Sequence, residues 1–226
     1  MTRFHQATLW LVCLPVLGAF THPSIAQTTS GSEIQILQRL AEERYAEGDL
    51  ERAAEIYQEI AGKQTESRDQ AKALFTAAWL MQLSGNQPEA LASMTHSLRM
   101  APDQLFDASL YNRDFELLYK QALDIALQQR QRKSIENTQA AVLEMNSGRD
   151  AQARLLLVAA TELDPGNPTA LYNLALLDLR AGTHGEAMAD FERVVSLTYN
   201  GSGPAMTELR AKALTSIGMI YQQQGL

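Results

Sequence analysis

Histidines, carboxylates and hydroxyls are the side chains that could do chemistry here, so their spacing decides whether an enzyme or a metal site is expected. Beyond residue 26 the sequence has two histidines, His96 and His184, which lie too far apart to match a zinc or copper site. The Asp and Glu residues are scattered over helical faces, as on a solvated surface. No Gly-x-Ser-x-Gly turn and no glycine-rich phosphate loop after a strand occur. We therefore expect no cofactor, no metal and no catalytic residue, because an enzyme would need convergent polar groups.

The first 26 residues have the pattern of a secretory signal peptide. Arg3 supplies a short positive region, an apolar core runs from Leu9 to Phe20, and small residues lead up to Ala26. Cleavage near Ala26 predicts a periplasmic or secreted protein. An uncleaved membrane anchor is the alternative, although the apolar core is short for a membrane span. Cys13 is the only cysteine, so the mature chain would have none.

The chain is acidic, with a net charge of −7. This charge disfavours nucleic acid and anionic membranes as partners, because both are negatively charged themselves. We therefore expect a protein or peptide partner, with membrane contact only if the signal stays attached.

From Glu33 onward the segments have a helical pattern, and small and apolar residues repeat at a spacing of 34 in the stretch from Ala140 to Phe191. A glycine ends the first helix of each segment, where a residue without a Cβ fits the turn. These glycines are Gly48, Gly85, Gly148, Gly182 and Gly225. A period of this length is typical of helix–turn–helix units that stack on copies of themselves.

This pattern resembles the tetratricopeptide repeat (TPR) family, whose unit of 34 residues has small residues at fixed points of both helices. The clearest matches are Pro168 to Gly201, Ser134 to Asn167 and Ala71 to Gln104, with a fainter one at Ile34 to Ser67. The resemblance implies an all-α, right-handed superhelical solenoid. The structural repeat positions that it implies are Ala41, Gly48, Ala53, Ala78, Gly85, Ala90, Ala141, Gly148, Ala153, Ala175, Gly182, Ala187 and Gly218.

The signal-like N-terminus and the resemblance together divide the chain. We expect a signal peptide at 1–26, a polar linker at 27–33, two TPR units at 34–104, an atypical helical seam at 105–133, two further units at 134–201, and a loop with a terminal half-unit or capping helix at 202–226. The seam is either a boundary between two groups of units or one more diverged unit. Asp114 is the expected N-cap of a helix within it.

Three residues depart from the family pattern. Arg44, Glu144 and Asp178 stand where the family usually has a large aromatic or apolar residue. Either the packing between those units is looser, or these side chains reach a polar partner.

The resemblance places the first helix of each unit along a concave groove. The groove residues carried over are Phe75, Trp79, Thr138, Val142, Met145, Tyr172, Leu176, Leu179, Thr215 and Met219. Apolar, aromatic and Met side chains on a partly exposed surface favour partner helices or extended peptides. The alternative for Phe75 and Trp79 is a core position beneath residues 105–127.

These observations predict a non-catalytic scaffold of the cell envelope that holds a partner protein or peptide in its concave groove. A self-associating module, or a fragment of a longer array, is the alternative, because an incomplete last unit leaves an apolar edge. An enzyme is a further alternative that the residues do not support.

Overall fold

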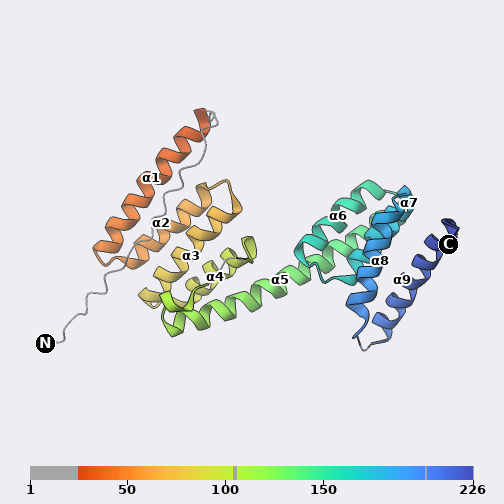
Figure 1. Cartoon of the computed structure of the whole chain (residues 1–226). Coiled ribbons are helices and arrows are strands. Elements are labelled where there is room, and N and C mark those ends of the chain that lie inside the picture. The colour runs from red at the N-terminus through yellow and green to blue at the C-terminus, as the bar shows by residue number, and fades with distance from the viewer. Residues whose placement is uncertain (1–24, 104–105, 202, 226) are drawn as a thin grey trace.

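Nine α-helices and one short 3-10 helix, with no strand, make up the part of the chain that the computed structural model describes, residues 25–103, 106–201 and 203–225. Figure 1 shows them in chain order. Residues 1–24 of the predicted signal peptide lie outside the described residues. The helices are α1 (Ile25–Ala46), α2 (Leu50–Lys63), α3 (Ser67–Ser84), α4 (Gln87–Met100), η1 (Ala108–Leu110), α5 (Arg113–Asn146), α6 (Asp150–Leu163), α7 (Pro168–Ala181), α8 (His184–Thr198) and α9 (Pro204–Gln223).

Consecutive helices pack in pairs, α1 with α2, α3 with α4, α5 with α6 and α7 with α8. The turn inside each pair contains one of the predicted glycines, and a fifth glycine follows α9. All five have φ between 73° and 89°, a left-handed conformation in which a Cβ is strained. These glycines therefore lie at or just after the helix ends in a left-handed conformation, and the predicted all-α solenoid of TPR-like units is confirmed.

Small residues lie where the two helices of a pair approach each other. Eight predicted alanines have no exposed surface, which allows the backbones to come close. They are Ala41, Ala53, Ala78, Ala90, Ala141, Ala153, Ala175 and Ala187. Gly218 on α9 occupies the repeat position that Ala175 occupies on α7, but Gly218 is exposed.

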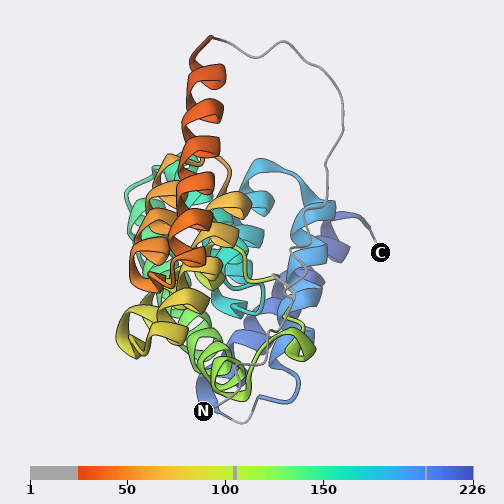
Figure 2. The ribbon, with the colours of Figure 1, turned by 90° about the vertical axis from the view of Figure 1, so that its left-hand side faces the viewer.

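Helix α1 begins earlier than the sequence analysis expected. Residues 27–33, predicted to be a linker, lie within α1, and Figure 2 shows the start of this helix projecting beyond the others. The polar residues of this segment cost a helix only a few tenths of a kcal/mol each, and Gly31 costs about 1 kcal/mol. No proline occurs between Ala26 and Ala46 to stop the helix.

Helix α5 corrects the predicted seam. The boundary expected at residues 133 and 134 falls inside this continuous helix of 34 residues, which contains no glycine or proline. Its N-cap is Asn112, not Asp114, because the Asn112 Oδ1 accepts a hydrogen bond from the Phe115 backbone N–H at 2.8 Å. One helix therefore ends the first group of helices and opens the second.

The connection from α4 to α5 differs from the turns within the helix pairs. Figure 1 shows α5 running alongside α4 in the same direction, whereas the two helices of each pair are antiparallel. The Arg130 side chain of α5 donates a hydrogen bond to the Arg99 backbone carbonyl in the last turn of α4. Helix α5 therefore begins beside the start of α4 and not beside its end.

Helix α5 buries different faces along its two halves. At about 100° per residue, the centres of the two buried faces differ by about 120° around the helix axis. The N-terminal half buries Phe115, Leu118, Ala122 and Ala126, and the C-terminal half buries Ser134, Thr138, Ala141 and Met145. The first set packs in the core of α2 to α4, and Ala141 and Met145 pack with α6 and α7.

None of the helices in the described ranges is both long and apolar enough to cross a lipid bilayer.

Candidate binding surfaces

Phe75 and Trp79, which the sequence analysis left open between groove and core, lie in an aromatic cluster. The centroid of the Phe75 ring lies 5.6 Å from that of Tyr111 and 5.5 Å from that of Phe115. The Trp79 ring centroid lies 5.1 and 4.8 Å from the same two centroids. Phe75 is only 7% exposed. The structure therefore places Phe75 in the core, with the partly buried Trp79 packed against it, beneath the segment after residue 105; the edge-to-face contacts favour a fixed arrangement.

The C-terminal group holds a row of equivalent side chains on three consecutive first helices. Val142 of α5, Leu176 of α7 and Met219 of α9 occupy one repeat position. Val142 and Leu176 are partly buried, and Met219 is 47% exposed. The surface formed by these three residues is called the inner row below.

The other predicted groove residues lie beside the inner row or beneath it. Tyr172 packs on Phe191 in a tilted arrangement with ring centroids 5.5 Å apart, so its ring belongs partly to the core of α7, α8 and α9. Met145 is buried among α5, α6 and α7. Thr138 is buried as well, and its hydroxyl accepts a hydrogen bond from the Asn167 amide at 3.2 Å.

The three polar residues at usually apolar positions each have a polar partner, as one of the two alternatives predicted. Arg44 pairs with Glu47, and Glu144 pairs with Arg149. Asp178 is 3% exposed and accepts a hydrogen bond from Arg154 of α6 at 2.5 Å. The last pair joins two successive units, so a buried charge replaces apolar packing there.

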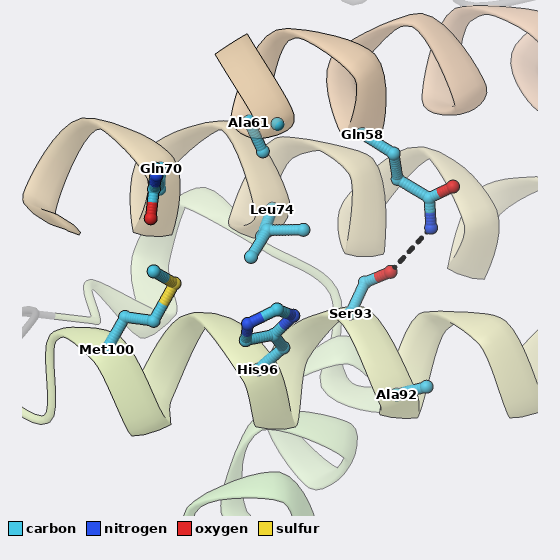
Figure 3. A pocket seen from close by; sticks show the side chains of 9 residues that line it. Gln58, Ala61, Gln70, Leu74, Ala92, Ser93, His96 and Met100 are labelled. Carbon is cyan, nitrogen blue, oxygen red and sulfur yellow. Dashed lines mark hydrogen bonds between the residues drawn. The ribbon is translucent and has the colours of Figure 1, made fainter. Parts of the chain in front are cut away.

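A hollow that the sequence analysis did not predict lies between α2, α3 and α4. Its volume is about 500 Å³, and Figure 3 shows Leu74 of α3 on its floor with His96 of α4 beside it. Gln58 donates a hydrogen bond to the Ser93 hydroxyl at 3.0 Å across one end. Small residues of α2 and α4 line the opening, among them Ala61, Gly62, Ala92 and Ser93. A run of small residues on second helices is the signal that could have indicated it.

A second hollow of about 460 Å³ lies between α4 and α5 and shares Ala92 and His96 with the first. Burial, and then the charge of Arg99, lower the pKa of His96, so this side chain is neutral at physiological pH. Both hollows are formed mainly by second helices, and neither contains a predicted groove residue.

No cluster of three or more His, Cys, Asp or Glu side chains with the geometry of a metal site occurs in the ranges that the structure covers.

Comparison with known proteins gives a likeness of fold only. No family model and no curated protein sequence matches this chain. The crystal structure of MamA is 16% identical over 82% of this chain and 85% of that chain, with a TM-score of 0.36. YrrB, a TPR protein with an unusual peptide-binding site, is 17% identical over 85% of this chain and 98% of that chain, with a TM-score of 0.31. A double mutant of MamA RS-1 is 13% identical over 75% of this chain and 97% of that chain, also with a TM-score of 0.31.

TM-scores of this size carry no functional argument. The fold follows from the helix pairs themselves, from the left-handed glycines in their turns and from the buried alanines at their crossings. The described chain is, on these grounds, an array of TPR-like helix pairs.

Proposed function

We propose that this protein is a non-catalytic scaffold of the cell envelope that binds a partner protein or peptide along the inner row. The observation that carries the proposal is the recurrence of an apolar side chain, at least partly exposed, at one repeat position of α5, α7 and α9. A partner that covers Val142, Leu176 and Met219 would remove apolar surface from water at about 25 cal/mol per Å². A helix or an extended peptide with apolar side chains has the matching chemistry.

The proposed compartment follows from the signal-like N-terminus. We expect export and cleavage near Ala26, with Gln27 as the first residue of the mature protein. N-terminal sequencing of the protein from a periplasmic extract tests this. Detection of the intact N-terminus in a membrane fraction would favour the uncleaved anchor.

The binding surface is tested by site-specific photocrosslinking in the cell. A photoreactive residue at Met219, which is 47% exposed, should capture a defined partner. The matched control is Leu155 of α6, which is 67% exposed but lies outside the inner row. Equal capture of the same proteins from both positions, or none from Met219, would contradict the inner row as the binding surface.

The substitution Met219→Glu provides a second readout. A carboxylate in the middle of an apolar contact loses its water without gaining a hydrogen bond or a counterion. A photoreactive residue placed at Val142 should therefore no longer capture the partner protein in this variant. Helical circular dichroism should stay unchanged, because Met219 contributes little to the core.

A further inference from the structure

Helix α7 shows what covers a first helix in this array. Leu171, Ala175 and Asp178 are 2%, 0% and 3% exposed. Leu171 and Ala175 belong to the same core cluster as Ala187 and Phe191 of the second helix α8. This face of a first helix is therefore covered by its own second helix at Leu171 and Ala175, and Asp178 contacts both Thr183, at the start of α8, and Arg154 of α6.

Helix α9 leaves the equivalent face open. Leu214, Gly218 and Tyr221 hold the positions of those three α7 residues, each 43 residues further along the chain. Leu214 is 51% exposed and Tyr221 is 43% exposed. A Cβ built on Gly218 meets no atom within 4 Å. In the described chain α9 packs on α8 and α7, and no second helix lies against this face, called the α9 face below.

The lack of charge on α9 indicates which kind of surface can pack on the α9 face. From Ala213 to Gln223 the helix has no charged residue, in a chain of which 20% is charged. A charged partner would therefore bury its charge here without a counterion, which is costly. An identical face, by contrast, brings only uncharged groups into the contact.

The α9 face also matches itself geometrically. Gly218 lies between two large side chains, Leu214 four residues before it and Tyr221 three residues after it. Two antiparallel α9 helices that cross at Gly218 place Leu214 of each copy near Tyr221 of the other. The glycines at the crossing allow the backbones a close approach. A two-fold interface requires such self-complementarity.

We propose that the α9 face is the contact surface of a symmetric dimer, in which α9 of a second copy packs on Leu214, Gly218 and Tyr221. One helix pair makes a small interface, so we expect dissociation constants in roughly the micromolar range. Because no ion pair holds the contact, added salt should leave the association unchanged or strengthen it.

Sedimentation equilibrium of the protein, purified from cells that express the full chain, tests the oligomeric state. Concentrations from about 1 to about 500 µM span the expected range. The wild type should change from monomer to dimer, and Leu214→Glu should weaken the dimer at least about tenfold, which is about 1.4 kcal/mol. The matched control is Thr215→Glu, which adds the same charge to an exposed neighbour off the α9 face and should leave the dimer intact. A monomer throughout, or a dimer insensitive to Leu214→Glu, overturns the proposal.

A cysteine crosslink tests the geometry separately. In a Cys13→Ser background, Gly218→Cys should form a disulfide-linked dimer on oxidation, because the two-fold axis brings the two positions together. Thr215→Cys should not, since the antiparallel crossing separates its two copies by about 9 Å along the helix axis. Equal crosslinking of both variants, or none of Gly218→Cys, rejects the antiparallel arrangement.

The dimer and the proposed scaffold function can fail independently. Leu214→Glu should abolish the dimer and leave crosslinking from Met219 intact, and Met219→Glu should do the reverse. If the crosslinked partner is lost in Leu214→Glu at a concentration where the wild type is monomeric, the α9 face binds that partner and not a second copy.

Discussion

At the scale of single residues, buried polar groups join neighbouring units more specifically than their apolar neighbours do. Asn167 is the best case, because its Oδ1 caps α7 by accepting bonds from the Thr169 and Ala170 backbone N–H groups. Its amide nitrogen donates to the Ser134 hydroxyl at 2.9 Å. Ser134 in turn donates to the Ala160 carbonyl at 2.8 Å. A single side chain therefore fixes α7 against α5, and through Ser134 against α6.

Removal of Arg154 tests the buried pair with Asp178. In Arg154→Ala the Asp178 carboxylate keeps the Thr183 hydroxyl, at 3.3 Å, but loses its cation. We expect a loss of about 2 kcal/mol in the free energy of unfolding, measured by urea denaturation. The control Arg180→Ala breaks the exposed pair with Asp150 and should cost less than about 1 kcal/mol. Equal losses would mean that the burial of Asp178 adds nothing.

Asp190 makes stability depend on pH in the opposite sense to an ordinary paired carboxylate. Burial, and then the neighbouring Asp178 charge, raise the pKa of Asp190 in the folded protein. A raised pKa means that this group's contribution to stability is full below its unfolded pKa and is lost as the pH rises through its folded pKa. Asp190→Asn should therefore raise the thermal midpoint at pH 7.

The same comparison at about pH 3, below the ordinary Asp pKa of about 3.9, should show no difference between Asp190→Asn and the wild type. Glu192→Gln, an exposed position on the same helix, is the control and should change neither midpoint. A lower midpoint for Asp190→Asn at pH 7 would show that the ionised carboxylate stabilises the fold.

At the scale of elements, the turns are set by backbone conformation and the interhelical contacts by small side chains. Gly182 ends α7 with φ of 80°, and its backbone N–H donates to the Leu179 carbonyl at 3.2 Å. The local sequence is enough to specify such a turn, because the requirement for a left-handed residue depends on no distant contact.

Gly182→Ala should lower the free energy of unfolding by about 1 kcal/mol, because alanine is strained at a left-handed φ. Gly185→Ala is the matched control, three residues later in α8 with open space for a Cβ. It should stabilise the protein by about 0.5 kcal/mol, since alanine is the better helix former. The two signs, read from urea denaturation, separate the turn from a general effect of alanine.

At the scale of the whole molecule, α5 is the element that joins the N-terminal and C-terminal groups of helices. Arg130, between its two buried faces, donates to the Arg99 carbonyl at 3.4 Å and to the Glu162 carbonyl at 2.9 Å. These carbonyls end α4 and α6, where a cation is favoured by the helix dipole. The Arg130 guanidinium therefore links the last turn of α4 and the last turn of α6 to α5.

Arg130→Ala should loosen both of these helix ends at once. We expect faster amide hydrogen exchange in peptides covering residues 95–101 and 158–164, with a loss of about 2 kcal/mol in stability, typical of bonds from a charged donor. Arg132→Ala, at an exposed position two residues away, is the control and should change neither peptide. Faster exchange at only one of the two ends would show that Arg130 does not connect the groups.

The sequence by itself determined the repeat, because its signals are local. Each glycine specifies a turn and each alanine permits a close crossing, whatever the rest of the chain does. Asp178 could be singled out as unusual, yet its partner Arg154 could not be named, because the pair forms only when α6 and α7 stack.

Only the tertiary structure decided how the two groups are joined and which apolar residues stay exposed. The unbroken run of helix formers in 113–146 permitted one helix, but the change of its buried face depends on which partners pack along it. Phe75 is core, with the partly buried Trp79 packed against it, because residues 106–115 fold back over them. Leu214 and Tyr221 are exposed because, among the described residues, no second helix packs on that face. The burial of a side chain depends on its tertiary contacts, and the spacing of residues along the chain does not specify these contacts.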